Sequence, residues 1–129
     1  TGRPAEAATV YRQALAQRPD HPPLRRRLAW LLATCPDPSV RQGAEALRLA
    51  QALVAMDGGR DPESLETLAA ALAESGAAPR AAQLQARIVA SAGGTPARQA
   101  RLACYQAGKP WRDERLASAP DTEAGKAPP

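Results

Sequence analysis

The sequence predicts an all-α protein, and three features of its composition support that fold class. Its 129 residues include 31 Ala and 14 Leu, which are among the strongest helix formers. Phe is absent, and one Ile, four Val, two Trp and two Tyr supply few of the β-branched and aromatic side chains that strands favour. The 13 Pro and 9 Gly must then lie at helix ends and in loops. The length suits one domain of about 100–200 residues.

A Leu-Ala pair recurs along the chain at a spacing of 34 residues. It stands at residues 68–69 and 102–103, and an earlier pair at 28–29 precedes the middle one by 34 residues plus an insertion of six. A period of 34 residues is that of the tetratricopeptide repeat (TPR), a pair of antiparallel helices. The chain resembles a TPR protein, and this resemblance implies an α-solenoid of antiparallel helical hairpins with about six or seven helices.

The first segment of the chain resembles the second helix of such a repeat. Gly2, Ala7, Tyr11, Ala14 and Pro19 have the spacing of the family's turn Gly, small residue, aromatic residue, small residue and closing Pro. The resemblance therefore implies that the chain begins inside a truncated repeat. The missing initiator Met also indicates a processed protein or a fragment. We expect residues 1–116 to form the repeat domain.

Two further helical hairpins are expected to follow. Residues 22–34 and 61–75 are expected to be the first helices of successive repeats. Residues 79–91 are expected to be a second helix, because Ala, Leu and Ile recur there at helical spacing. The loop at residues 35–43 is longer than the tight turn of the family.

Residues at the predicted helix ends support these boundaries. Asp61 and Thr95 each precede a proline, and their side chains can cap the helices that begin there. The Gly-Gly pairs at 58–59 and 93–94 are interpreted as helix stops, where a positive φ is often needed.

The C-terminal part is expected to close the solenoid. Residues 28–38, LAWLLATCPDP, resemble a variant that recurs in bacterial multi-repeat proteins, where a segment like residues 105–112, YQAGKPWR, often follows near the chain end. This resemblance implies that residues 95–117 are the closing helices, with Trp111 packing them onto the last repeat. Residues 117–129 lack an apolar pattern and are expected to be a disordered tail.

The sequence offers no constellation for catalysis or metal binding. His21 is the single His and is interpreted as a solvated loop residue. Cys35 and Cys104 form no Cys-x-x-Cys pair, whereas a zinc site needs about four Cys or His ligands. A hairpin is expected to separate the two cysteines, so both are interpreted as small buried residues without a disulfide. We expect no enzyme activity, no metal and no cofactor.

The charge of the chain is modest and widely spread. The net charge is +4, and the basic residues lie along the whole sequence, so a nucleic-acid partner is not expected. The one basic run, residues 25–27, would fan across roughly 200–300° of a helix. It is therefore interpreted as a mainly solvated face, with Arg26 as the exception. No run of about 18 apolar residues occurs, so membrane insertion is not expected.

The resemblance also implies a binding surface, because the first helices of this family line a concave groove that holds peptides or partner helices. The equivalent positions here are Arg26, Trp30, Ala33 and Thr34, then Glu63, Glu66, Ala70 and Ala73, then Ala100 and Cys104. The implied function is a non-catalytic module that binds a protein or peptide segment in this groove. Trp30 is either an exposed hot-spot anchor or a packing residue, and the sequence leaves both open.

Two other functions stay open at this stage. The chain could be a structural end-cap or assembly subunit that docks on a larger complex, or on a second copy, through its open N-terminal hairpin. In that case Ala7, Tyr11, Ala14 and Leu15 would lack an intramolecular neighbour and form the docking face. A third and weaker alternative is an accessory nucleic-acid binder. The sequence does not indicate a compartment.

Overall fold

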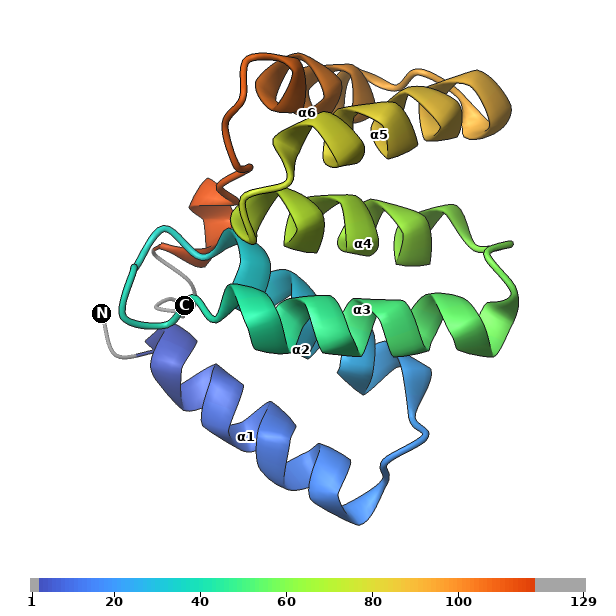
Figure 1. Cartoon of the computed structure of the whole chain (residues 1–129). Helices are drawn as coiled ribbons and strands as arrows, with labels where there is room; N and C mark the ends of the chain where they lie inside the picture. The colour runs from blue at the N-terminus through green and yellow to red at the C-terminus, as the bar shows by residue number, and fades with distance from the viewer. Residues whose placement is uncertain (1–2, 118–129) are drawn as a thin grey trace, which may run out of the picture.

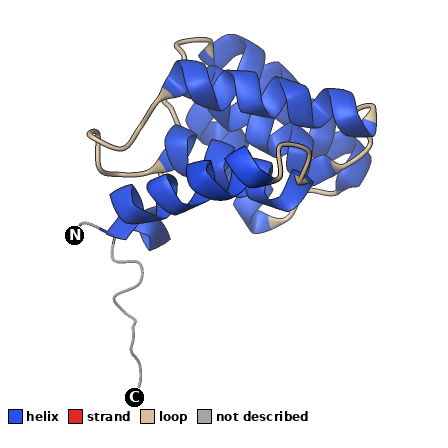
Figure 2. Ribbon diagram, turned by 90° about the horizontal axis from the view of Figure 1, so that it is seen from below, coloured by secondary structure: helices blue, strands red, loops and turns tan. Residues whose placement is uncertain are grey.

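The computed structural model describes residues 3–117 and confirms the all-α prediction. These residues contain no strand, and their helices are joined by short loops (Figure 2). The six α-helices are α1 (Arg3–Gln17), α2 (Pro22–Thr34), α3 (Gly43–Asp57), α4 (Pro62–Glu74), α5 (Ala78–Ala92) and α6 (Pro96–Gln106), and η1 (Glu114–Leu116) is a short 3-10 helix. The tail expected at residues 117–129 lies outside the described residues, apart from Ala117.

The helices stack in chain order and alternate in direction (Figure 1). Each helix contacts the next one along the chain, and α2 also contacts α4. The arrangement is therefore like that of a helical-repeat protein, in which each unit is stabilised by its neighbours. The helices α2, α4 and α6 run in one direction, and α1, α3 and α5 run in the other (Figure 1).

Side-chain caps and prolines account for where the helices begin. Asp61 and Thr95 cap α4 and α6 as predicted, accepting backbone N–H groups at 2.9 and 3.2 Å. A proline occupies the first turn of both helices, where its missing N–H is tolerated. The interpretation of His21 as a solvated loop residue is wrong, because its half-buried ring caps α2. Its Nδ1 accepts the backbone N–H of Leu24 at 3.2 Å.

The prediction of more than one closing helix is also wrong, because α6 ends at Gln106 and the chain then becomes irregular up to η1. Gly108 adopts a left-handed φ of +80°, and the N–H of Lys109 donates to the carbonyl of Cys104 at 3.1 Å. This pattern terminates a helix, and Pro110 cannot resume it because proline lacks the N–H donor. The segment that follows, residues 109–116, is called the C-terminal strap below.

The core consists of two clusters of small and branched apolar residues. The first joins α1, α2, α3, α4 and the 35–42 loop, and its largest members are Leu28, Leu31 and Leu32. The second lies among α4, α5 and α6, around Tyr105. Trp111 packs against this second cluster, which confirms its expected role of holding the closing segment on the last hairpin. The many alanines at these contacts let the helices approach closely.

Candidate functional site

A pocket of about 630 Å³ lies on the side of the stack formed by α2 and α4. α1 borders it on one side, and α6 and the C-terminal strap border it on the other. Tyr11, Trp30, Leu31 and Leu116 supply much of its apolar lining. Pockets that hold small ligands or side chains of a partner usually measure about 300–1,000 Å³, so this pocket has the size of a binding site.

Four of the residues that the sequence placed in a groove line this pocket, namely Arg26, Trp30, Glu63 and Glu66. They come together because α2 and α4 pack side by side and each presents residues three or four apart on one face. Glu63 and Arg26 pair at 3.6 Å across the two helices. These four of the groove positions that the resemblance implies therefore lie on adjoining faces of α2 and α4.

The other groove positions are not part of the pocket. Thr34 and Ala70 are buried, so the prediction that they contact a partner is wrong. Both lie one turn further along their helices, where packing of α2 on α4 covers them, and the Thr34 hydroxyl donates to the carbonyl of Trp30 at 2.7 Å. Ala33 and Ala73 are likewise buried, whereas Ala100 is exposed and Cys104 is half-buried outside the pocket.

The alternative docking face on α1 is mostly turned inward. Ala7, Tyr11 and Leu15 pack against the first core cluster, and Ala14 is half-buried. The prediction that these residues lack an intramolecular neighbour is wrong, because α1 packs on α2. Ala7 and Tyr11 instead line the pocket together with α2, so both sets of predicted contact residues contribute to one site.

The C-terminal strap holds Trp30 in place, and sequence reasoning missed this contact. The indole Nε1 of Trp30 donates to Oδ2 of Asp113 at 2.9 Å, and the backbone N–H of Asp113 donates to the carbonyl of Thr34 at 2.9 Å. Arg112 donates to Glu74 at 2.8 Å. Figure 1 shows the chain after α6 running back past the ends of α5 and α4 to reach α2. The only signal for this contact in the sequence was the resemblance to bacterial multi-repeat proteins, in which segments like residues 28–38 and 105–112 often occur together.

Trp30 is a partly covered side chain. The guanidinium of Arg101 lies 5.1 Å from the centroid of its ring and 5.7 Å from that of Trp111. This cation–π contact joins α6 to α2 and to the strap. Trp30 is half-buried and lines the pocket with part of its surface, so it both packs and remains accessible.

Glu66 is a buried anion at the base of the pocket, with only 6% of the residue exposed. It accepts hydrogen bonds from Arg101 at 2.6 Å, Arg98 at 2.9 Å and Gln85 at 3.1 Å. Burial raises the pKa of Glu66, but the hydrogen bonds from Arg98, Gln85 and Arg101 outweigh it and leave the pKa below its usual value. Glu66 therefore ties α4 to α5 and α6, and its charge is already satisfied.

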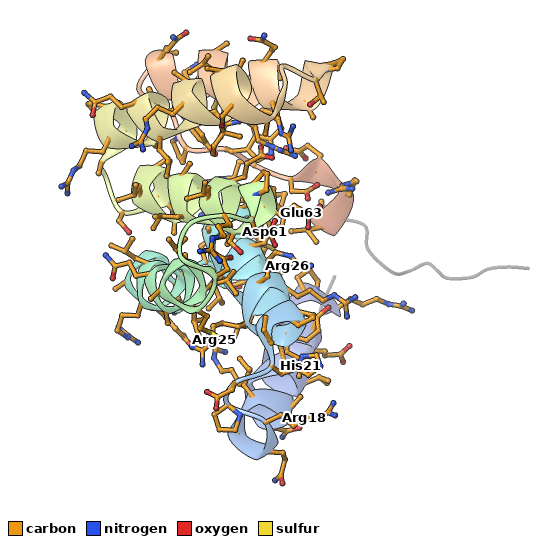
Figure 3. The ribbon with its side chains drawn as sticks, turned by 90° about the vertical axis from the view of Figure 1, so that its right-hand side faces the viewer. Arg18, His21, Arg25, Arg26, Asp61 and Glu63 are labelled. Atoms are coloured by element: carbon orange, nitrogen blue, oxygen red, sulfur yellow. The ribbon has the colours of Figure 1, made fainter. Side chains whose placement is uncertain are left out.

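The three consecutive arginines do not all face one surface, as the helical spacing predicted. Arg26 and Arg27 line the large pocket, whereas Arg25 lines a second, smaller pocket and donates to the carbonyl of Pro19. Figure 3 shows Arg26 close to the start of α4, near Asp61 and Glu63, with Arg25 nearer the turn between α1 and α2.

The two thiols are free, and Cys35 is buried while Cys104 is half-buried. Burial raises the pKa of both, so neither is an activated nucleophile. Residues 3–117 contain no group of three or more His, Cys, Asp or Glu side chains arranged to hold a metal ion. None of the helices in this part of the chain combines the length and the hydrophobicity that crossing a membrane requires.

Comparisons of this chain with protein-family models, with curated proteins and with solved structures found no match.

Proposed function

We propose that this chain is a TPR-like module that binds a peptide segment of a protein partner in the pocket between α2 and α4. The proposal is supported by the 34-residue period and by the helical-repeat-like stacking of the six helices. In this view α2, α4 and α6 are the first helices of successive repeats, and α1 is the second helix of a truncated one.

A single observation carries the proposal. Four of the ten groove positions that the resemblance implies, Arg26, Trp30, Glu63 and Glu66, line one pocket together. The pocket combines an aromatic and aliphatic lining with charged groups at its edge, which is the composition of peptide-binding grooves.

The geometry supports recognition by a preformed surface. Trp30 is held by Asp113 at 2.9 Å and by the Arg101 guanidinium, and Glu66 is held by two arginines. Side chains fixed in this way lose little conformational freedom when a partner binds, which favours affinity. The partner would place an apolar side chain against Trp30 and polar groups at the edge.

The test is a selection from a random dodecapeptide display library with the full chain as bait. The affinity of the best peptide is then measured by fluorescence anisotropy. We expect Arg26→Ala and Trp30→Phe to weaken binding at least about 5-fold, because both side chains line the pocket. Arg80→Ala is the matched control, because Arg80 is exposed on α5 and lies outside the pocket.

Two results would refute the proposal. One is a selection that yields no peptide with saturable binding. The other is a selected peptide whose affinity is unchanged by both pocket substitutions. Far-UV circular dichroism of each variant shows whether it is folded, and Arg26→Ala keeps the test decisive if Trp30→Phe is destabilised. No observation favours the end-cap alternative, because the inner face of α1 is already packed on the core.

A further inference from the structure

The lining of the pocket carries more positive than negative charge. Five arginines and two glutamates of the described residues border it, and the arginines are Arg3, Arg26, Arg27, Arg101 and Arg115. Glu66 is already committed to Arg98 and Arg101, at 2.9 and 2.6 Å. Glu63 is paired with Arg26 alone. Arg101 and Arg115 are in turn paired with Glu66 and Asp113, so the positive charge left for an outside partner is the surplus on the α2 side, at Arg27 and the loosely held Arg26.

This surplus is accessible on the α2 side of the pocket. Arg27 is exposed, and no carboxylate of residues 3–117 forms an ion pair with it. Arg26 is held only loosely, because its partner Glu63 lies 3.6 Å away and has a side chain that is 68% exposed. The guanidinium groups of Arg26 and Arg27 can therefore donate hydrogen bonds to the carboxylates of a partner without breaking a buried ion pair.

The same pocket also offers apolar surface to an occupant. The rings of Tyr11 and Trp30 and the side chain of Leu116 contribute to its lining and are only partly buried. Trp30 comes from the same α2 face as Arg26, four residues along the helix. An occupant that satisfies both features carries apolar side chains and carboxylates close together.

We infer that the partner segment is acidic and amphipathic, with leucine-like side chains against Trp30 and Tyr11 and with Asp or Glu side chains on Arg26 and Arg27. This inference rests on the proposed peptide-binding function and specifies the chemistry of the partner at the same site. Charge complementarity of this kind sets the choice of partner and the rate of association.

The geometry favours a polypeptide over a nucleic acid. Binding of single-stranded nucleic acid relies on aromatic rings that are open for base stacking. One face of the Trp30 ring is instead occupied by the guanidinium of Arg101, and its N–H is bound to Asp113.

The test uses three fluorescein-labelled dodecapeptides and the full chain. The first repeats Leu-Glu-Glu four times, the second replaces each Glu with Lys, and the third replaces each Leu with Ser. We expect the first to bind at least about 10-fold more tightly than the other two. We expect Arg27→Glu to weaken its binding about 5- to 10-fold. Arg87→Glu on exposed α5 surface is the matched control and is expected to change it less than 2-fold.

The outcomes separate this inference from the proposed function. If the display selection yields cationic or uncharged peptides whose binding depends on Arg26 and Trp30, the module binds peptides but the acidic partner is wrong. If no peptide of any charge binds, both ideas fail. If a labelled oligothymidylate binds more tightly than the acidic peptide, and Arg27→Glu abolishes that binding, the pocket recognises nucleic acid and the inference is overturned.

Discussion

Replacing Glu66 by Gln tests how the base of the pocket is held together. The substitution keeps the size of the side chain but removes the charge that Arg98 and Arg101 share. Both guanidinium groups are largely buried, because their side chains are 18% and 17% exposed. The variant therefore leaves two cations in a poorly solvated site without their counter-ion.

The expected loss follows from this geometry. Removing one partner of a buried ion pair typically destabilises a protein by about 3–5 kcal/mol. Arg98 retains a hydrogen bond to the carbonyl of Ala92 at 3.0 Å, and Arg101 retains its contacts with the two indole rings. We therefore expect a loss somewhat below that range, about 2–3 kcal/mol, in a domain whose whole stability is about 5–15 kcal/mol. For a chain of this length that loss lowers the melting temperature by roughly 6–12 °C.

The assay is thermal and urea unfolding followed by circular dichroism at 222 nm. Glu63→Gln is the matched control, because Glu63 lies one turn earlier on α4 and pairs with a single arginine at the surface. We expect the control to lose less than about 0.5 kcal/mol. Equal melting temperatures for the two variants would show that the buried network does not stabilise the fold, and would refute the reasoning.

Three further predictions concern pH, thiols and a turn. Burial raises the pKa of Glu66 and Asp113, but hydrogen bonds outweigh it and lower both values. Stability should therefore be full above the unfolded pKa of about 4 and fall below it, and a flat urea midpoint between pH 6 and 3 would contradict this. Ellman's reagent should modify half-buried Cys104 in the folded protein and buried Cys35 only on unfolding, so equal rates would contradict the structure. Gly76→Ala should cost about 1–2 kcal/mol, measured by urea unfolding, because Gly76 has a φ of +93°.

Local signals in the sequence were sufficient to predict the helices of the middle of the chain. The prediction of residues 22–34 matches α2, and residues 61–75 differ from α4 only by the capping residues Asp61 and Ser75. These boundaries depend on prolines and capping residues that act within one helical turn, so they can be recognised in a single sequence.

The pocket could be predicted only in part, because it depends on contacts between distant segments. The repeat spacing placed Trp30 and Glu66 on adjoining faces, but burial of Thr34 depends on how closely α2 packs on α4. The contact of Trp30 with Asp113 spans 83 residues and requires the chain to turn back after α6. The periodicity of the sequence does not predict that contact, because it depends on the path that the chain takes after α6 ends and Gly108 adopts a positive φ.

The C-terminal strap also has a consequence for the order in which the protein matures. An open repeat array can form from its first units while the rest of the chain is still being synthesised. Here Arg101, Arg115 and Leu116 border a pocket that begins with residues of α1 and α2, so its wall is incomplete until the last of them has left the ribosome. A nascent chain thus exposes Trp30 without its partner Asp113. The proposed binding of a peptide therefore requires the finished domain, and we expect truncation before residue 113 to separate helix formation from that binding.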